Sequence, residues 1–521
     1  MRLSLLKHLA LLTPCFALSA CSSPPNAMGS DTIGTQRPNV IMIYTDDMNF
    51  KDAAVFGGKE VMTPTIDRLA NEGARLDRYY VSSPVCTPSR YNLLTGRYAS
   101  YSSTLLERYP TSEPAFLRWN THIEEGENTI AEMFQNSGYV TGFVGKYHNF
   151  ENEAIQLHNE LDDDPRDPEV AARIAKNYQD MKSIIQQLTG FDYMESLYYN
   201  NLHAMALPAE MQQHNQEWVT QSALEFIDQN HGKPFYLYMA TTTPHGPPPV
   251  ASMKSDPRIT PAGFLDQAPQ VQASRDSAFI RVKQAGLPES AAVMLWIDDA
   301  IQALLDKLEH HDLLDNTMII FASDHSGKNG GRGKMTNYEG GVNTPAFVWW
   351  PKKISPQQVD GLVSSVDIVP TILDATGVST EQPLDGQSML PLLTGQTDQL
   401  RDDAYLEITY TRGVVTDRWK YIAVRFPSDI RDDARQNPGK YNQEGLTQTT
   451  DALAGTLRSR YRAHELHPGY FDFDQLYDLQ NDPDERHNLA NDPAYADVLA
   501  EMKARLKQHV APLPHAFGEF K

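Results

Sequence analysis

The chain has 521 residues, of which 40% are hydrophobic and 21% are charged, and this length favours two domains because single cores rarely exceed about 250–300 residues. Its 45 basic residues are outnumbered by 67 acidic residues, which gives a formal net charge of −22. This balance excludes a broad electrostatic surface for nucleic acid or anionic lipid, so an anionic substrate must be held by a local basic pocket.

The first 21 residues have the pattern of a secretory signal peptide: a basic start, an apolar stretch and then small residues. Residues 18–21 resemble the lipobox of bacterial lipoproteins, in which Cys21 becomes the lipidated first residue of the mature chain. An ordinary signal peptide cleaved near Ala20 is the alternative. Residues 22–36, rich in Ser, Pro and Gly, are predicted to form a flexible tether. We therefore expect an exported protein that is lipid-anchored in the bacterial cell envelope, at the outer membrane or in the periplasm.

Further along the chain, apolar runs that are typical of buried strands each end in polar residues. The runs are Val40–Tyr44, Val140–Val144, Phe235–Met239 and Met318–Phe321. The polar residues that follow them are Asp46 and Asp47, then Lys146 and His148, then His245, and finally Asp324 and His325. Amphipathic helix patterns over 128–137, 218–229 and 292–308 come before the later strands. This alternation predicts a largely parallel sheet with helices on both faces.

The carboxyl ends of the strands in such a sheet form the ligand-binding edge, so these polar residues are expected to converge. Lys334, in the loop after the last of these strands, is expected to reach the same edge. Each residue alone is weak evidence, because a strand that ends in Asp is often only a turn and a lone histidine is usually a satisfied core or surface residue. The repeated placement at one end of each strand favours a functional site.

Cys86 is the only cysteine after residue 21, so the mature protein cannot form an internal disulfide. Thr87 is predicted to cap a helix whose first residue is Pro88 and whose end lies at Gly96. Cys86 would then lie just before the helix N-terminus, where unpaired N–H groups and the helix dipole favour an anion. Arg90, one turn into this helix, adds further donors for an oxyanion.

The chemistry of Cys86 stays open at this point. A cysteine in this position can be a nucleophile with a low pKa. The predicted metal ligands Asp46, Asp47 and Asp324 are hard oxygen donors suited to Ca²⁺ or Mg²⁺, for which a thiolate is a poor partner. Cys86 and His325 would favour zinc instead, but three carboxylates make zinc the weaker choice. From these residues alone, the soft sulfur of Cys86 does not suit the hard metal ion that the neighbouring carboxylates favour.

The stretch Cys86-Thr-Pro-Ser-Arg90, followed by Leu94-Thr-Gly-Arg97, resembles the signature C-[ST]-P-S-R-x4-TG of the formylglycine-dependent (type I) sulfatases. The resemblance covers most of the chain from Pro38 onward. Further similar segments, in chain order, are 38–47, 63–70, 145–148, 244–245, 323–325, 338–341, 476–483 and 488–489.

In that family the cysteine is oxidised to formylglycine, whose hydrate uses one oxygen to bind the cation and attack sulfur and the other to help expel sulfate. The resemblance therefore implies an oxygen ligand at position 86, which matches the hard metal ligands. It implies a cation that is Ca²⁺ rather than Mg²⁺, held by Asp46, Asp47, Asp324, His325 and the modified Cys86.

The resemblance also implies roles for the remaining polar residues. Arg90, Lys146 and Lys334 would neutralise the sulfate oxygens. His148 would hydrogen-bond the formylglycine hydroxyl, and His245 would protonate the leaving alcohol or bind the sulfate oxygen nearest to it. The chain departs from the family pattern at His325, where Asn is commonest, and this weakens the expectation of Ca²⁺.

The fold implied by the resemblance is alkaline-phosphatase-like: an α/β domain with a large mixed, mostly parallel sheet flanked by helices, followed by a smaller C-terminal α+β domain with an antiparallel sheet. We expect a signal peptide over 1–21, a tether over 22–36, a catalytic domain over 37–400 and a C-terminal subdomain over 401–521. Helix patterns over 367–377 and 496–510 agree with this arrangement.

Two inserts, 149–216 and 250–288, are expected to form the walls of the substrate cleft. A basic and aromatic cluster in the C-terminal part would bind sulfate groups or sugar rings, with a solvated charged face as the equally weighted alternative. Its members are Arg458, Arg460, Tyr461, Arg462, His464 and His467.

The expected function is hydrolysis of sulfate esters on a carbohydrate, such as an oligosaccharide released from a polysaccharide. Besides this substrate, the expected partners are a formylglycine-generating enzyme or an anaerobic maturase and a membrane bound through the lipid anchor only, without nucleic acid. The alternatives are a phosphodiesterase or phosphonate monoester hydrolase of the same superfamily and a non-catalytic, glycan-binding surface lipoprotein.

Overall fold

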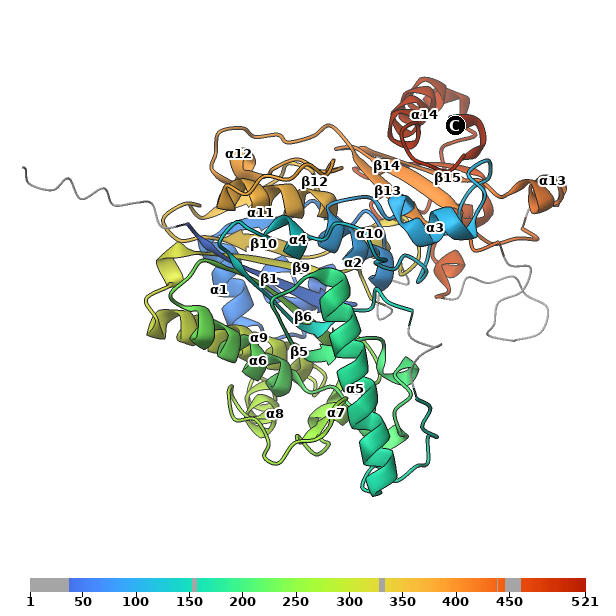
Figure 1. The fold of residues 1–521 in the computed structure, drawn as a ribbon. Coiled ribbons are helices and arrows are strands. Elements are labelled where there is room, and N and C mark those ends of the chain that lie inside the picture. The colour runs from blue at the N-terminus through green and yellow to red at the C-terminus, as the bar shows by residue number, and fades with distance from the viewer. Residues whose placement is uncertain (1–36, 152–156, 328–332, 438, 446–460) are drawn as a thin grey trace, which may run out of the picture. The chain divides into compact units, whose positions relative to one another are not determined.

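The computed structural model describes residues 37–151, 157–327, 333–437, 439–445 and 461–521, so the predicted signal peptide, lipidated Cys21 and tether lie outside the described residues. Its central sheet has the strand order β11-β2-β10-β9-β1-β6-β4-β5 (Figure 1). Neighbouring strands are parallel except at β10, which runs antiparallel to both β9 and β2. The strands cover Asn39–Asp46 (β1), Ala74–Leu76 (β2), Val140–Lys146 (β4), Tyr193–Tyr198 (β5), Phe235–Pro244 (β6), Thr317–Ser323 (β9), Ala346–Trp349 (β10) and Gln357–Val359 (β11).

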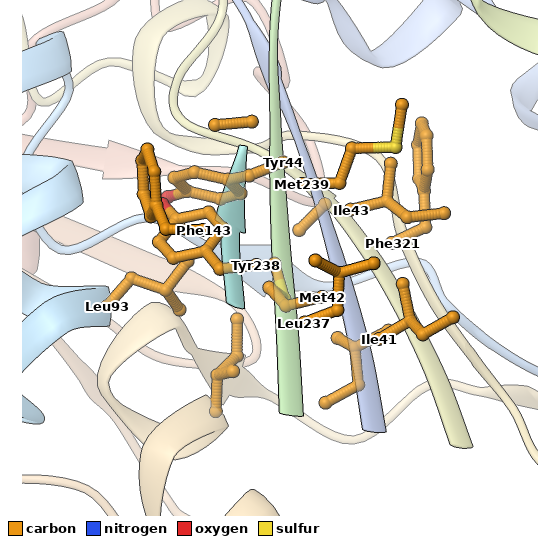
Figure 2. Packing of buried hydrophobic residues seen from close by; sticks show 14 of the residues in the cluster. Ile41, Met42, Ile43, Tyr44, Leu93, Phe143, Leu237, Tyr238, Met239 and Phe321 are labelled. Atoms are coloured by element: carbon orange, nitrogen blue, oxygen red, sulfur yellow. The ribbon is translucent and has the colours of Figure 1, made fainter. Parts of the chain in front are cut away.

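The apolar runs predicted as strands are confirmed as β1, β4, β6 and β9, and these strands are consecutive neighbours in the sheet. Ile41 of β1 pairs with Leu237 of β6 on one side and with Ile319 of β9 on the other. Figure 2 shows side chains of these strands, including Ile43 and Met239, packed in the core. All of these residues are fully buried. Strands that are covered on both faces read as continuous apolar runs, which is why the sequence predicts them.

Helices cover both faces of the sheet (Figure 1). The helices α6 and α9, predicted over 218–229 and 292–308, are confirmed to within two residues at each end. On one side lie α1 (Pro64–Glu72), α6 (Gln216–Asn230) and α9 (Ala291–His310). On the other lie α2 (Cys86–Thr95), α4 (Ile130–Met133) and α11 (Ile368–Thr376).

The helix predicted over 128–137 is wrong in length, because α4 ends at Met133. The side chain of Thr129 accepts the backbone N–H of Glu132, and the Glu132 side chain accepts the N–H of Thr129, so the start is a capping box. After α4 the chain forms a turn in which Asn136 has a left-handed φ of 59°. That conformation is incompatible with a continuing helix, so the helical spacing of apolar residues in the sequence continues beyond the end of the helix itself.

The C-terminal part contains a four-stranded antiparallel sheet in the order β13-β14-β15-β16. Its strands are Ala404–Ile408 (β13), Thr411–Val415 (β14), Trp419–Val424 (β15) and Asp474–Asp478 (β16). The final helix α14 (Ala496–Val510) has the predicted bounds and packs on β14 and β15. The fold class is therefore confirmed, whereas a domain boundary near residue 400 stays a prediction.

The other elements are short or peripheral to the main sheet. No helix among the described residues is both long enough and apolar enough to cross a membrane. The remaining α-helices among the described residues are α3 (Ser103–Arg108), α5 (Pro168–Thr189), α7 (Pro249–Met253), α8 (Arg275–Gln284), α10 (Glu339–Val342), α12 (Leu390–Leu393) and α13 (Ser428–Gln436). Two small strand pairs join β3 (Tyr79–Tyr80) to β12 (Val363–Ser364) and β7 (Ile259–Thr260) to β8 (Gly263–Phe264).

Candidate active site

The polar residues that follow the central strands meet at the carboxyl edge of the sheet. Asp46 ends β1 and Lys146 ends β4, and Lys146 Nζ donates a 2.5 Å hydrogen bond to Asp46 Oδ2. Asp324 directly follows β9, and its Oδ1 accepts a 3.0 Å hydrogen bond from the backbone N–H of Asp47. Asp47 has a left-handed φ of 65°, which is uncommon outside glycine and clusters at functional sites. The structure thus brings the strand ends together as the sequence predicts.

Helix α2 places Cys86 within its first turn, and the predicted start at Pro88 is wrong. The carbonyl of Val85 accepts a 3.1 Å hydrogen bond from the N–H of Ser89, so helical bonding begins before Cys86. The hydroxyl of Thr87 has no hydrogen-bond partner and does not cap the helix. The predicted end is confirmed, because Gly96 follows the helix with a left-handed φ of 69°. Cys86 is fully buried.

Arg90 of α2 connects the strand ends. Its Nη1 donates to the carbonyl of Lys146 at 2.8 Å, and its Nη2 donates to Asp324 Oδ2 at 2.9 Å. The same Nη2 lies 3.6 Å from Asp46 Oδ1. Because both terminal nitrogens are already bonded and the side chain is buried, Arg90 holds the other charged groups in place.

Lys334 and His325 lie around the sulfur of Cys86. Lys334 Nζ is 3.6 Å from the sulfur and donates a 2.7 Å hydrogen bond to Asp47 Oδ1. His325 Nε2 is 3.2 Å from the sulfur and 3.1 Å from Asp47 Oδ1. The predicted approach of Lys334 to the edge of the sheet is therefore observed.

The donor atoms of Asp46, Asp47, Cys86 and His325 all lie within 4.8 Å of one another, a spacing at which they can hold one metal ion. His325 Nδ1 donates a 2.8 Å hydrogen bond to the Ser326 carbonyl, so Nε2 is the nitrogen that faces this group. Burial opposes protonation of the ring, but the nearby negative charges, that of Asp324 foremost, raise the pKa of His325 to about 9, so Nε2 loses a proton when it binds a cation. Asp46 Oδ1 is buried and accepts no hydrogen bond. A bare carboxylate oxygen beside other donors is what a cation site requires, so these residues fit a cation.

Asp324, although it contacts Asp47 and His325, is the one predicted ligand that does not belong to this group of donors. Its two oxygens are occupied by the N–H of Asp47 and the guanidinium of Arg90. Oδ1 of Asp324 is 3.6 Å from His325 Nε2. Its role as a metal ligand stays a prediction.

Lysines favour the ionised forms of Asp46, Asp47 and Cys86, whereas burial raises the pKa of Asp324 to about 7. Burial alone would raise the pKa of Asp46, but the surrounding positive charges, that of Lys146 foremost, together outweigh burial and hold the pKa well below its usual range. Burial would also raise the pKa of Asp47, but nearby positive charges, that of Lys334 foremost, together lower it to about 2. Burial also opposes ionisation of Cys86, yet both lysines lower the pKa of its thiol to about 6. The unmodified thiol is therefore largely a thiolate at neutral pH.

Two further histidines complete the predicted set. His148 has a left-handed φ of 63°, and burial together with Lys146 holds its pKa well below the usual value. His245 Nδ1 donates a 2.6 Å hydrogen bond to the Gly246 carbonyl, and its Nε2 lies 3.8 Å from Asp47 Oδ2. Burial lowers the pKa of His245 as well. Without ligand, both imidazoles are neutral at neutral pH.

A cavity of about 330 Å³ opens onto this site. The predicted residues His148, His245 and Lys334 line it, so a bound molecule can reach the buried charges. Insert 149–216 contributes several lining residues, whereas no residue of 250–288 is among the described residues that line the cavity. The full lining is Thr87, Arg108, Trp119, His122, His148, Phe150, Glu151, Asn200, Asn201, His203, Ala204, His245, Lys334 and Tyr461.

Sequence reasoning missed Asn201 and His214. Asn201 Oδ1 accepts a 2.7 Å hydrogen bond from Lys146 Nζ, and its Nδ2 lies 3.4 Å from His148 Nε2. The ring of His214 lies 2.8 Å from Thr242 Oγ1 and 3.1 Å from the Pro247 carbonyl, so it joins both ends of the loop that carries His245. Both belong to insert 149–216, for which the sequence predicts a location but no individual roles.

The described members of the basic and aromatic cluster lie in different surroundings, and the prediction that the whole cluster binds sulfate groups or sugar rings stays a prediction. Tyr461 lines the cavity, with its ring centroid 5.9 Å from Lys334 Nζ. His467 is instead buried and stacks on Tyr338 with ring centroids 3.7 Å apart. Arg462 pairs with Glu465 at 2.5 Å. The two remaining arginines of the cluster, Arg458 and Arg460, lie outside the described residues.

Comparison with known proteins gives consistent matches along most of the chain. A family model described as "Sulfatase" matches residues 38–378, and one described as "N-sulphoglucosamine sulphohydrolase, C-terminal" matches residues 327–463. An ulvan-active sulfatase of Formosa agariphila is 25% identical over 507 residues, covering 93% of this chain and 84% of that protein. An N-acetylgalactosamine-6-O-sulfatase of Bacteroides thetaiotaomicron is 26% identical over 593 residues, covering 97% of this chain and 98% of that protein.

The fold is also similar to the crystal structure of the phosphonate monoester hydrolase of Agrobacterium radiobacter. The TM-score is 0.58 at 18% identity, with 91% of this chain and 96% of that chain covered. At this identity the likeness concerns the fold alone, so the fold does not separate the two chemistries.

Proposed function

Because this chain belongs to the sulfatase family and is a sulfuric ester hydrolase, we propose that it desulfates a carbohydrate with a formylglycine made from Cys86, beside a bound divalent cation. The observation that carries this proposal is the position of Cys86. It lies in the first turn of a buried helix, within 3.6 Å of Lys334 Nζ and 3.2 Å of His325 Nε2. These groups suit an oxygen nucleophile and a sulfate ester better than a free thiol.

For the cation, we propose Ca²⁺ held by Asp46, Asp47, Asp324, His325 and the oxygen that replaces the sulfur at position 86. When bound, the cation supplies charge that stabilises the nucleophilic oxygen and the sulfate. Mostly hard oxygen donors favour Ca²⁺ or Mg²⁺ over zinc, and Ca²⁺ accepts an irregular set of ligands more readily than Mg²⁺, which demands octahedral geometry. The imidazole of His325 is the one donor in this set that Ca²⁺ does not prefer. Chelation with EDTA is expected to abolish turnover, and Ca²⁺ is expected to restore it better than Mg²⁺. Full turnover after chelation and dialysis would refute a resident cation.

Formylglycine supplies, as its hydrate, one hydroxyl for attack on sulfur and a second that helps to expel the sulfate. The chain's own residues prepare the site for this chemistry. Lys146 and Lys334, whose ammonium groups already face carboxylates, neutralise the sulfate oxygens, while Arg90 keeps Asp324 and β4 in place.

The leaving alcohol receives its proton from His245 in this proposal. Its Nδ1 is held by the Gly246 carbonyl, so Nε2 is the nitrogen that takes up and delivers the proton. The anionic substrate raises the pKa of a nearby imidazole, which offsets the effect of burial. His148, buried and neutral, is suited to accept a proton from the hydroxyl at position 86.

The carbohydrate substrate is supported by the relatives, which are named as an ulvan-active sulfatase and an N-acetylgalactosamine-6-O-sulfatase. The cavity agrees with such a substrate, because it combines the aromatic rings of Trp119 and Tyr461 with the cationic Lys334. A phosphonate monoester hydrolase shares the fold and is the second candidate.

The deciding experiment compares substrates on correctly matured protein. The protein is co-produced with a formylglycine-generating enzyme or an anaerobic maturase, and the mass of the peptide that contains Cys86 verifies the conversion. Sulfate release is then measured from a panel of sulfated oligosaccharides and from an aryl sulfate, beside the matching aryl phosphodiester. We expect sulfate release in wild type and its loss in Cys86→Ala. A large preference for the phosphodiester, or wild-type turnover in Cys86→Ala, would refute the proposal.

We also propose that the protein is exported and attached to the cell envelope through a lipid on Cys21. The support is the lipobox-like sequence of residues 18–21, with an ordinary signal peptide as the alternative. Incorporation of a labelled fatty acid in wild type but not in Cys21→Ser tests this. Equal labelling of both proteins would exclude this cysteine as the anchor.

A further inference from the structure

The cavity carries a second charged group beside the residues already described. Arg108 ends α3, and its Nη2 lies 3.5 Å from Oε2 of Glu151. His122 Nδ1 lies 3.8 Å from the same oxygen. Glu151 is the only acidic residue among the described residues that line the cavity. We refer to Arg108 and His122 as the second basic pair.

This pair is held in position but is incompletely bonded. The ring of His122 is buried, yet its Nδ1 has no hydrogen-bond partner. The backbone of His122 is fixed, because its N–H donates to Thr104 Oγ1 at 3.3 Å and its carbonyl accepts from Ser102 Oγ at 3.3 Å. Arg108 and Glu151 are 48% and 57% exposed, and an exposed ion pair at this distance contributes little to stability. Glu151 can therefore be displaced at low cost.

The second basic pair is connected to the proposed reaction centre. The side-chain amide of Asn149 donates to the carbonyl of Thr121 at 2.9 Å and to the carbonyl of Thr87 at 2.7 Å. One buried side chain thus holds the residue before His122 and the residue after Cys86. A ligand in the cavity can reach both sites at once.

We propose that Arg108 and His122 bind a second anionic group of the substrate, a sulfate or a carboxylate, and that Glu151 occupies their place until the substrate displaces it. This inference rests on the proposed function and narrows the substrates to carbohydrates with at least two anionic groups. The planar fork of Arg108 fits the oxygens of either group. The ring of His122 gains the hydrogen bond that a buried polar nitrogen requires.

The test measures binding by isothermal titration calorimetry to the full chain with unmodified Cys86, which separates affinity from turnover. The ligands are disaccharides with one sulfate, with two sulfates, and with one sulfate and one carboxylate. We expect the second anion to tighten binding about tenfold in wild type, and Arg108→Gln to remove most of this gain. Arg118→Gln alters an exposed arginine that is not among the residues described as lining the cavity, and it is expected to keep the gain.

Glu151→Gln gives a result that loss of structure cannot imitate. Removal of the competing carboxylate is expected to tighten binding of the doubly anionic ligands about two- to threefold. Equal affinity of wild type for singly and doubly anionic disaccharides, an unchanged gain in Arg108→Gln, or weaker binding in Glu151→Gln would overturn the inference. Sulfate release by matured protein is measured separately. Tighter binding of doubly anionic disaccharides without any sulfate release would refute the proposed function but would still support the second anion-binding site.

Discussion

Asn201 is positioned to act on catalysis through two other residues. Its carboxamide accepts a hydrogen bond from Lys146 and lies beside His148, and it touches the cavity as well. It therefore fixes where the ammonium group points when a substrate enters. Asn201 thus resembles the residues that orient the direct ligands of a metal ion. Loss of such an orienting residue typically reduces activity about 10- to 100-fold.

We predict that Asn201→Leu lowers kcat/KM for an aryl sulfate by about 10- to 100-fold, because Lys146 loses its second partner and rotates. The free energy of unfolding is measured in parallel and is expected to fall by only about 1–2 kcal/mol. Asn230→Leu, at the end of α6, is the matched control and is expected to keep wild-type kcat/KM. A loss of stability without a loss of kcat/KM in Asn201→Leu would contradict the positioning role.

His214 sets a pH dependence of stability. Burial lowers its pKa to about 3, far below the value of about 6.5 in an unfolded chain. Between these values the unfolded chain binds a proton that the folded protein does not bind. Stability is therefore complete above about pH 6.5 and decreases as the pH falls toward about 3.

From this difference we predict that wild type loses about 2 kcal/mol more unfolding free energy than His214→Gln between about pH 7.5 and about pH 5. Urea unfolding at both pH values measures the loss. His487→Gln, which alters a histidine with an 80% exposed side chain, serves as the control and is expected to behave like wild type. Equal pH dependence in wild type and His214→Gln would show that His214 does not titrate in this way.

At the scale of the element, β4 depends on Gly145 to deliver Lys146. Gly145 has a φ of 97°, and a Cβ at this position would lie 1.8 Å from the carbonyl oxygen of Ala240 in the neighbouring β6. Gly138 has a similar φ of 82°, but a Cβ there would meet nothing within 4 Å. An alanine at position 138 would therefore suffer backbone strain only, whereas an alanine at position 145 would suffer both backbone strain and steric overlap.

We predict that Gly138→Ala reduces the free energy of unfolding by about 1–2 kcal/mol, the cost of a left-handed conformation. Gly145→Ala is expected to reduce it by at least about twice as much and to lower kcat/KM at least about tenfold, because β4 must move away from β6 and carry Lys146 with it. Thermal unfolding and aryl sulfate hydrolysis measure both effects. Equal losses of stability in the two variants would contradict this prediction, because they would show that the overlap of the new Cβ with the Ala240 carbonyl does not destabilise the protein.

The strands show what the sequence can and cannot predict. β1, β4, β6 and β9 are predictable because each is an apolar run buried on both faces. β2, β10 and β11 have only 3 or 4 residues, which is too short for a periodic pattern. The sequence predicts the start of α2 two residues too late, because Thr87 and Pro88 fit a cap and a first helical residue. The hydrogen bond to the Val85 carbonyl instead depends on how the whole segment is buried.

The site was predictable where residues follow strand ends or match the sulfatase signature. Asn201 follows neither rule, and it lies 55 residues from its partner Lys146. The second basic pair is similar, because Arg108 and Glu151 belong to segments without a shared pattern. Contacts of this kind arise only when loops are folded together, so the sequence indicates the region but not the partners.

At the scale of the whole described chain, the C-terminal sheet supports the loop that carries Lys334. Tyr338 Oη donates a 2.7 Å hydrogen bond to Gln475 of β16, and the N–H of Glu339 donates to Glu485 at 2.7 Å. Lys420 of β15 is fully buried between Glu339 and Glu485, at 2.6 and 2.9 Å. The C-terminal part therefore contributes to the position of a site residue that it does not contain.

Lys420→Met is predicted to reduce the unfolding free energy by about 3–5 kcal/mol, because two carboxylates lose their buried counter-charge. Turnover is expected to fall as well, since the Lys334 loop loses its attachment. The matched control is Lys503→Met, whose pair with Asp474 at 3.1 Å is about one-third exposed and is worth about 0–1 kcal/mol. Similar small losses in both variants would show that the buried charges find other partners.

The complete burial of Cys86 has a consequence for the order of events during synthesis. Its neighbour His325 lies 239 residues further along the chain. At about 5–20 residues per second, the ribosome adds this length in roughly 10–50 s. During much of that interval the cysteine is outside the ribosome, while its neighbours His325 and Lys334 have not yet been synthesised. A modifying enzyme that needs access to the thiol competes with folding and must act before the chain closes over it. Slow translation between these positions would then increase the active fraction without any change in sequence.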